Sequence, residues 1–132
     1  MSDKILVKII LPSAIMLETQ ATMVNIPGIE GEFGVLFGHA KLVSNLDIGV
    51  VTLYSGETKQ RYFIHGGVAQ ISDSEVNILT EFAIDLSSAK KSSVLHKITE
   101  LKSNLLDKEP ESVEADIISD ALEKHETLIN FL

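Results

Sequence analysis

The chain has 132 residues, 45% of them apolar, and a net charge of −8. This length and composition predict one domain, or one domain with an appendage, that has enough apolar residues for a core. The acidic balance argues against nucleic-acid binding, which needs clustered lysine and arginine, and the lack of cysteine excludes disulfides, a thiol nucleophile and a thiolate metal site.

The amino-terminal segment MSDKILVKII has neither the apolar run of a secretion signal, because Lys8 interrupts it, nor the arginine and serine of a transit peptide. No apolar run in the chain approaches the roughly 18 residues that a membrane helix needs. We therefore expect no direct membrane insertion, and any membrane association to run through a partner.

Up to about residue 84 the apolar pattern is that of short strands rich in valine, isoleucine, tyrosine and phenylalanine. These runs cover residues 5–11, 22–26, 50–54, 60–65, 67–71 and 75–79. Turn residues separate them, as in Ser55-Gly56-Glu57. Many short strands with frequent turns predict a β-sandwich or a flattened barrel.

The segment GIEGEFGVLFGH, residues 28–39, holds four of the eight glycines, the carboxylates of Glu30 and Glu32, and His39. It lacks the Gly-Lys-Ser/Thr ending of a P-loop and the glycine spacing of a dinucleotide fingerprint, so nucleotide binding is not predicted here. Two interpretations stay open. The glycines shape a loop whose carboxylates contact a partner protein, or the segment is a structural turn with solvated carboxylates.

No other pattern in the chain predicts chemistry. The histidines lie far apart and form no ligand pair at helical spacing, so no metal site is expected. No nucleophile with a base, and no converging pair of carboxylates, can be identified. We expect no catalytic residues and no cofactor.

Beyond residue 84 the period becomes helical. One apolar stripe comprises Val94, Ile98, Leu101 and Leu105, and a second comprises Ile118, Leu122, His125 and Ile129. The sequence therefore predicts two helices with a short connection, which favours an antiparallel hairpin.

The ends of these helices have recognisable residues. We expect Asp85, Ser87 and Ser88 to begin the first helix, the DKEP stretch at 107–110 to end it, and Ser112 to cap the second. The predicted domains are a β-domain at 1–84 and a helical hairpin at 85–132. The hairpin is either a static element or a mobile one, and the pattern favours neither.

Two stretches resemble the epsilon subunit of F-type ATP synthases. VNIPGIEGEFGVLFGHAKLVSNLDIGVV, residues 24–51, is similar to the signature PGxxGEFGVLPGHAPLxTxLxPGxV of that family. YFIHGGVAQISDSEVNILTEFA, residues 62–83, resembles its next block, with the Gly66-Gly67 pair in place. Phe37 and Lys41 stand where the family usually has proline.

The resemblance implies a ten-stranded β-sandwich followed by a two-helix hairpin. It also implies a non-catalytic subunit of the rotating central stalk, which links the gamma subunit to the c ring and couples proton transport to ATP synthesis. The absence of a transit-peptide pattern favours the bacterial form, peripheral on the cytoplasmic side of the inner membrane.

Residue by residue, the GEFG turn of the family meets the c ring, which corresponds here to Glu30, Gly31 and Glu32. The GHA turn lies at the gamma subunit, which corresponds to His39, Ala40 and Leu42. Both assignments are expectations from the resemblance.

The hairpin departs from the family in two ways. Ile84, Asp85 and Ala89 match an ATP-binding motif of some members, but Ser88 replaces its arginine and no arginine follows, so an ATP-sensing module is the less favoured alternative. Some members inhibit ATP hydrolysis by contacting the alpha and beta subunits through a basic hairpin. Residues 111–132 here carry six acids and one lysine, which predicts weak inhibition.

Overall fold

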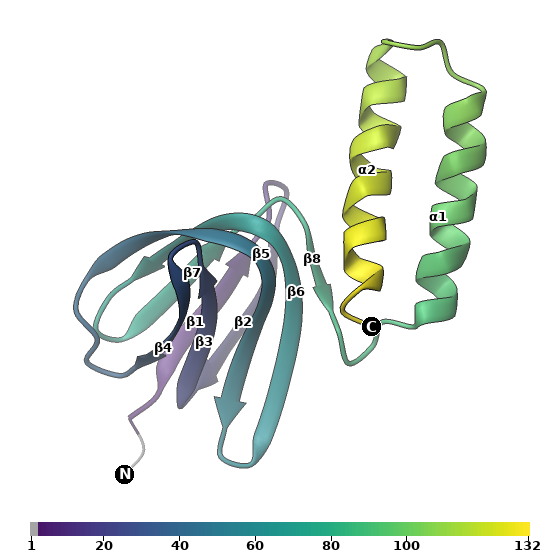
Figure 1. Cartoon of the computed structure of the whole chain (residues 1–132). Coiled ribbons are helices and arrows are strands. Elements are labelled where there is room, and N and C mark those ends of the chain that lie inside the picture. The colour runs from purple at the N-terminus through teal and green to yellow at the C-terminus, as the bar shows by residue number, and fades with distance from the viewer. Residues whose placement is uncertain (1–2) are drawn as a thin grey trace. The chain divides into compact units, whose positions relative to one another are not determined.

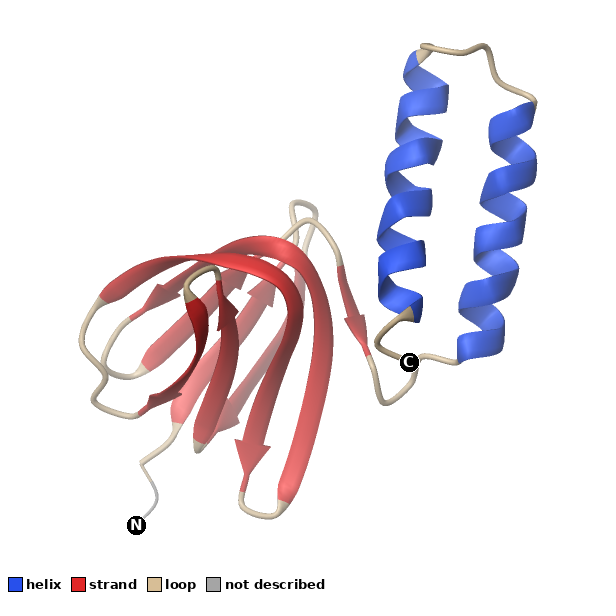
Figure 2. Cartoon of the chain, in the orientation of Figure 1, coloured by secondary structure: helices blue, strands red, loops and turns tan. Residues whose placement is uncertain are grey.

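The structure is a computed structural model that describes residues 3–132. The chain divides between Ser87 and Ser88 into two compact units. The first is a curved β-sheet and the second a pair of helices (Figures 1 and 2). No helix in the described residues has the length and apolar character to span a membrane.

The first unit is one continuous sheet. Its strands are β1 (Ile5–Ile10), β2 (Ile15–Ala21), β3 (Met23–Gly28), β4 (Gly31–Leu36), β5 (Leu42–Ser55), β6 (Thr58–Ile71), β7 (Glu75–Leu79) and β8 (Ala83–Asp85). They follow the order β2-β1-β7-β6-β5-β3-β4, and β8 pairs with β6. The β1–β7 pair is parallel and the other pairs are antiparallel.

The core forms because successive side chains of a strand point to opposite faces. In β1, Ile5, Val7 and Ile9 are fully buried, while Lys8 lies on the other face and pairs with Glu75 of β7 across 3.3 Å. Most of the buried side chains of β3, β4, β5, β6 and β7 join the same core cluster, whereas Phe63 of β6 is fully buried outside it. Both ends of the sheet therefore contribute to one core, as in a β-sandwich.

The long strand β6 passes from one layer of the sandwich to the other. It pairs with β8 through Tyr62–Ile64 and with β7 through Val68–Ile71. Gly66 and Gly67, between these segments, have φ values of 80° and 139°, which side-chain-bearing residues rarely adopt. The bend is held by the hydroxyl of buried Thr80, which donates to the carbonyl oxygen of Gly66 at 2.7 Å.

The β-sandwich is confirmed, but the count of ten strands is not, since the described residues form eight. The reason lies in β5 and β6, which are 14 residues long and pair with each other from Leu42–Ile71 to Ser55–Thr58. Each of these strands continues through the bend without a break (Figure 2), so each counts once.

The second unit is a helical hairpin of α1 (Lys91–Leu106) and α2 (Val113–Ile129), which pack against each other. Val94, Ile98 and Leu101 form the buried side of α1. Ser112 caps α2, because its side chain accepts from the backbone amide of Ala115 at 3.0 Å, as predicted.

The start of the first helix was predicted wrongly. Asp85 belongs to β8, and its carboxylate accepts from the amide and the hydroxyl of Ser87 at 2.9 and 2.7 Å, closing a local turn. Helix α1 begins later, at Lys91, and Lys90 before it makes no side-chain cap. The domain boundary after residue 84 stays a prediction.

The bend at Gly67 generates a stability prediction. A Cβ atom at this position would overlap the backbone carbonyl of Leu79, whereas a Cβ at Gly56, also at positive φ, would meet open space. We expect Gly67→Ala to lower the free energy of unfolding by about 3 kcal/mol or more, and Gly56→Ala by about 1 kcal/mol. Urea denaturation of the two variants measures this difference, and equal losses would contradict the clash.

Candidate interaction surface

Residues 28–32, which we call the acidic turn because they include Glu30 and Glu32, form the tip of the β3–β4 hairpin. Gly28 pairs with Gly31, so Ile29 and Glu30 alone form the connection. The amide of Ile29 donates to the carbonyl oxygen of Asn45 in β5 at 3.1 Å. The tip is therefore fixed to a neighbouring strand, which makes it stiffer than a free loop.

A glycine at position 28 is required by close packing within this hairpin. A Cβ atom there would lie 2.8 Å from both the carbonyl oxygen of Gly31 and the Cε1 atom of Phe33. Phe33 packs against the sandwich core, so it cannot easily withdraw. The interpretation of the glycines as residues that shape the turn fits this geometry, and the partner of the turn is a separate question.

The carboxylate of Glu32 is held in place by a residue that the sequence analysis did not single out. Asn25 Nδ2 donates to Glu32 Oε1 at 2.7 Å. The register pairs Asn25 with Gly34 and Pro27 with Glu32, so Asn25 and Glu32 are diagonal neighbours on one face. Strand alternation and the two-residue turn were the signals in the sequence that could have identified this pair.

A hollow of about 550 Å³ lies beside the turn. Residues 28–33 and the first residues of β5, 42–45, line it. Its apolar side chains are unusually accessible: Ile29 is 61% exposed, Val43 68% and Leu42 43%. The structure thus brings Glu30, Gly31 and Glu32 together with Leu42, which the resemblance had assigned to the gamma contact.

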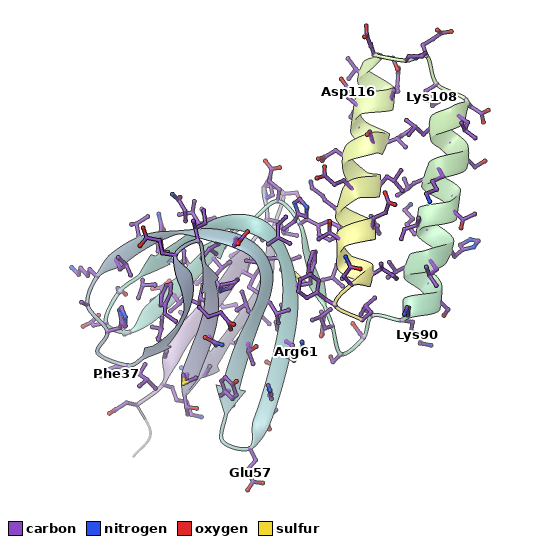
Figure 3. All side chains as sticks on the ribbon, viewed as in Figure 1. Phe37, Glu57, Arg61, Lys90, Lys108 and Asp116 are labelled. Atoms are coloured by element: carbon purple, nitrogen blue, oxygen red, sulfur yellow. The ribbon has the colours of Figure 1, made fainter. Side chains whose placement is uncertain are left out.

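Residues 37–40, which we call the histidine turn because they include His39, follow β4. The amide of His39 donates to the carbonyl oxygen of Leu36 at 3.1 Å, and Gly38 between them has a φ of 86°. The amide of Gly38 donates to the backbone carbonyl oxygen of Asp73 at 2.6 Å, which ties the turn to the β6–β7 connection. Phe37, one of the two departures from the family pattern, projects from this turn (Figure 3).

His39 and Ala40 are linked within the turn. His39 Nδ1 lies 2.7 Å from the carbonyl oxygen of Ala40, a distance at which the tautomer protonated on Nδ1 donates a hydrogen bond to that oxygen. Leu42 lies two residues further on and also borders a second hollow, of about 310 Å³, with Lys41 and Glu75. Leu42 and Val43 therefore line both hollows.

The residues of the degenerate ATP motif fall in different units. Ile84 and Asp85 pair with Phe63 and Tyr62 in the sheet, while Ala89 belongs to the second unit. Burial, and to a smaller extent the charge of Asp85, raises the pKa of Tyr62 above its usual value of 10.0.

Comparison with known proteins agrees with this architecture. The family model "ATP synthase, Delta/Epsilon chain, beta-sandwich domain" matches residues 4–86. An ATP synthase epsilon chain of Rickettsia bellii is 40% identical over 108 residues, which cover 80% of this chain and all of the relative.

Solved structures give the same result. A chain in the Euglena gracilis mitochondrial ATP synthase structure of OSCP, F1 and c-ring is 27% identical, with a TM-score of 0.65 over 96% of this chain and 79% of the other. A chain in the Tetrahymena thermophila mitochondrial central stalk and c-ring structure, 10% identical with a TM-score of 0.54, shares the fold over 96% of this chain and 94% of its own length. With its sandwich matched almost from end to end, the chain belongs to the ATP synthase delta/epsilon chain family.

Proposed function

We propose that this chain is a non-catalytic subunit of the rotating central stalk of ATP synthase. In this role it links the gamma subunit to the c ring and couples proton transport to ATP synthesis. The epsilon-chain name of the Rickettsia relative supports the proposal, as does the similarity to a chain of the Euglena complex.

The observation that carries the proposal is that the acidic turn is hydrogen-bonded to the neighbouring strand β5 and its carboxylate to Asn25. Torque transfer needs contacts that do not yield, and a carboxylate held by Asn25 on a hairpin bonded to β5 meets this need. We assign the c-ring contact to Glu30, Gly31 and Glu32. A partner can bind these carboxylates through charge-assisted hydrogen bonds.

The gamma contact is assigned to His39, Ala40 and Leu42. This turn is fixed on one side by the bond from Gly38 to Asp73 and on the other by the entry into β5. Two turns at consecutive positions along the chain, each anchored to the sandwich, give one stiff unit two docking points. We place the subunit as a peripheral component at the cytoplasmic side of the bacterial inner membrane.

The helical hairpin is assigned a regulatory contact with the alpha and beta subunits. It exposes large apolar side chains, among them Leu106, Val113 and Ile117, of the kind that a partner surface covers. Its second helix is strongly acidic, so it is repelled by an acidic partner loop. We infer that its inhibition of ATP hydrolysis is weak and rests on apolar contacts or on the basic first helix.

The alternative, an ATP-sensing module, has less support. The one arginine of the chain, Arg61, lies in β6, and its carbonyl oxygen accepts the amide of Leu86. Asp85 is engaged with Ser87. The motif has Ser88 in place of its arginine and no arginine follows it, so the guanidinium that would bind phosphate in a bidentate manner is missing from the motif itself.

The first prediction concerns the acidic turn. Glu32→Lys reverses the charge at the c-ring contact and removes the acceptor of Asn25, so we expect the contact to weaken about tenfold, or ~1.4 kcal/mol. Proton pumping driven by ATP hydrolysis in the assembled enzyme should fall while hydrolysis continues. Glu57→Lys, the same change at the far tip of the β5–β6 hairpin (Figure 3), is the control and should leave pumping intact. Normal pumping by Glu32→Lys would refute the contact.

A second prediction concerns the hairpin. We expect removal of residues 87–132, which leaves the matched β-sandwich, to raise ATP hydrolysis by the assembled enzyme less than about twofold, because the acidic second helix binds poorly to an acidic surface. Steady-state hydrolysis of the two assemblies measures the ratio. A rise of tenfold or more would show that strong inhibition does not need a basic second helix.

A third prediction separates the two functions. Calorimetric titration of the purified chain with ATP should give no saturable heat, because the motif lacks its arginine. Saturable binding at millimolar ATP or below that Asp85→Ala abolishes would establish the sensing module instead.

A further inference from the structure

We propose that the hollow beside the acidic turn is an anchor pocket for the partner loop, which inserts an apolar side chain and places a cationic one against Glu32. The inference rests on the proposed function and adds to it the chemistry of the occupant. It also assigns three residues: Ile29 and Val43 as apolar anchors, and Asn25 as the residue that positions Glu32.

Exposed apolar side chains gather at the hollow. Isolated apolar side chains are common on protein surfaces, but Ile29, Leu42 and Val43 all border one hollow, and two of them are more than 60% exposed. A cluster of this kind beside a concave surface marks an interaction site. Its volume of about 550 Å³ is far larger than a single side chain needs, so a loop, rather than one atom group, fits it.

The charged side chains that line the hollow are all acidic. Of the residues lining the hollow, Glu30 and Glu32 are the charged ones, and no lysine, arginine or histidine lies among them. Charges across an interface are arranged to be complementary. The occupant therefore carries a cation next to its apolar side chain, and an acidic loop is excluded by repulsion.

The hydrogen bond from Asn25 decides the geometry of that ion pair. It occupies Glu32 Oε1 at 2.7 Å, and among the described residues Oε2 has no bonded partner, so this oxygen is left to the incoming cation. Fixing the carboxylate before binding reduces the entropy that the contact loses. Asn25 thus acts through Glu32 and does not itself need to touch the partner.

The walls of the hollow are held together independently of any partner. The bond from Ile29 to Asn45 joins the turn to β5, and β5 pairs with β6 along its whole length. The pocket is therefore present before binding, and small changes of its apolar lining should alter affinity without changing the fold.

The test of the anchors uses binding to the purified c ring in detergent, with the full chain in complex with its gamma subunit. We expect Val43→Asp and Ile29→Asp each to weaken binding about tenfold or more, because each adds a negative charge and removes an apolar contact. Ile15→Asp is the matched control: Ile15 is 54% exposed on β2 and does not line the hollow, so binding should stay within about twofold. Circular dichroism and the Tm establish that each variant folds.

The test of Asn25 is a double-mutant cycle. Asn25→Ala should weaken binding severalfold in the native chain and should have no further effect in a Glu32→Ala background, where Asn25 has no side-chain oxygen left to hold at position 32. Equal losses in both backgrounds would show that Asn25 positions nothing through Glu32.

The outcomes separate the inference from the function on which it rests. If Glu32→Lys weakens c-ring binding while Val43→Asp and Ile29→Asp bind like Ile15→Asp, the anchor pocket is refuted and the proposed function stands. If the native complex does not bind the c ring, both fail.

Discussion

The backbone hydrogen bond from Ile29 to Asn45 is the interaction on which the candidate surface depends. It holds the two-residue hairpin tip against β5, so that the tip forms one wall of a hollow and β5 the other. Gly28 makes this possible because a side chain there would collide with Gly31 and Phe33. The glycines, the exposed apolar side chains and the acidic rim are therefore parts of one geometry.

That geometry is supported by the way the sheet bends. Gly66 and Gly67 let β6 change its partner from β8 to β7, and the same bend carries β5, which pairs with β6 throughout. One end of the β5–β6 ribbon reaches the acidic turn and the other ends in the Glu57 hairpin. A load applied at the turn is thus shared by a strand ladder of 14 residues, which suits a part that transmits force.

The sequence predicted much of this fold, for identifiable reasons. Runs of residues with strong β propensity predicted β1, β3 and β7. The apolar stripes at helical spacing, together with Ser112 as a cap, predicted the helical hairpin. The sequence pattern missed β2, where the alternation in Ile15–Ala21 mixes apolar with polar residues and no glycine or aromatic residue draws attention. It also missed β4, because the glycines in Gly31–Leu36 indicated a loop, and the short β8, whose Asp85 was assigned to the start of a helix. The sequence pattern divided β6 into two separate runs, because the Gly66-Gly67 pair indicated the end of a strand. In the structure these glycines form a bend within one continuous strand.

The candidate surface was predicted less completely. The glycine spacing and the two carboxylates identified the turn, since they are local features. Asn25 and Val43 have no such local mark. Asn25 reaches Glu32 through the register of β3 and β4, which strand alternation and the two-residue turn could have indicated. Val43 lines the hollow only because β5 returns beside the turn. The family resemblance assigned Leu42 to the gamma contact, whereas in the structure Leu42 lines the hollow beside the acidic turn. Its distance from the turn along the sequence does not reveal that β5 returns beside the turn.

The most direct test of the central claim is a cross-linking measurement in the assembled enzyme. The chain has no cysteine, so Glu30→Cys offers a single point of attachment for a photo-activated cross-linker, and Glu57→Cys provides the same label at the opposite end of the β5–β6 ribbon. We predict that illumination joins position 30 to the c subunit and leaves position 57 unjoined to it. A label at position 30 that never reaches the c subunit, or that reaches it no more often than the label at position 57, would contradict the account.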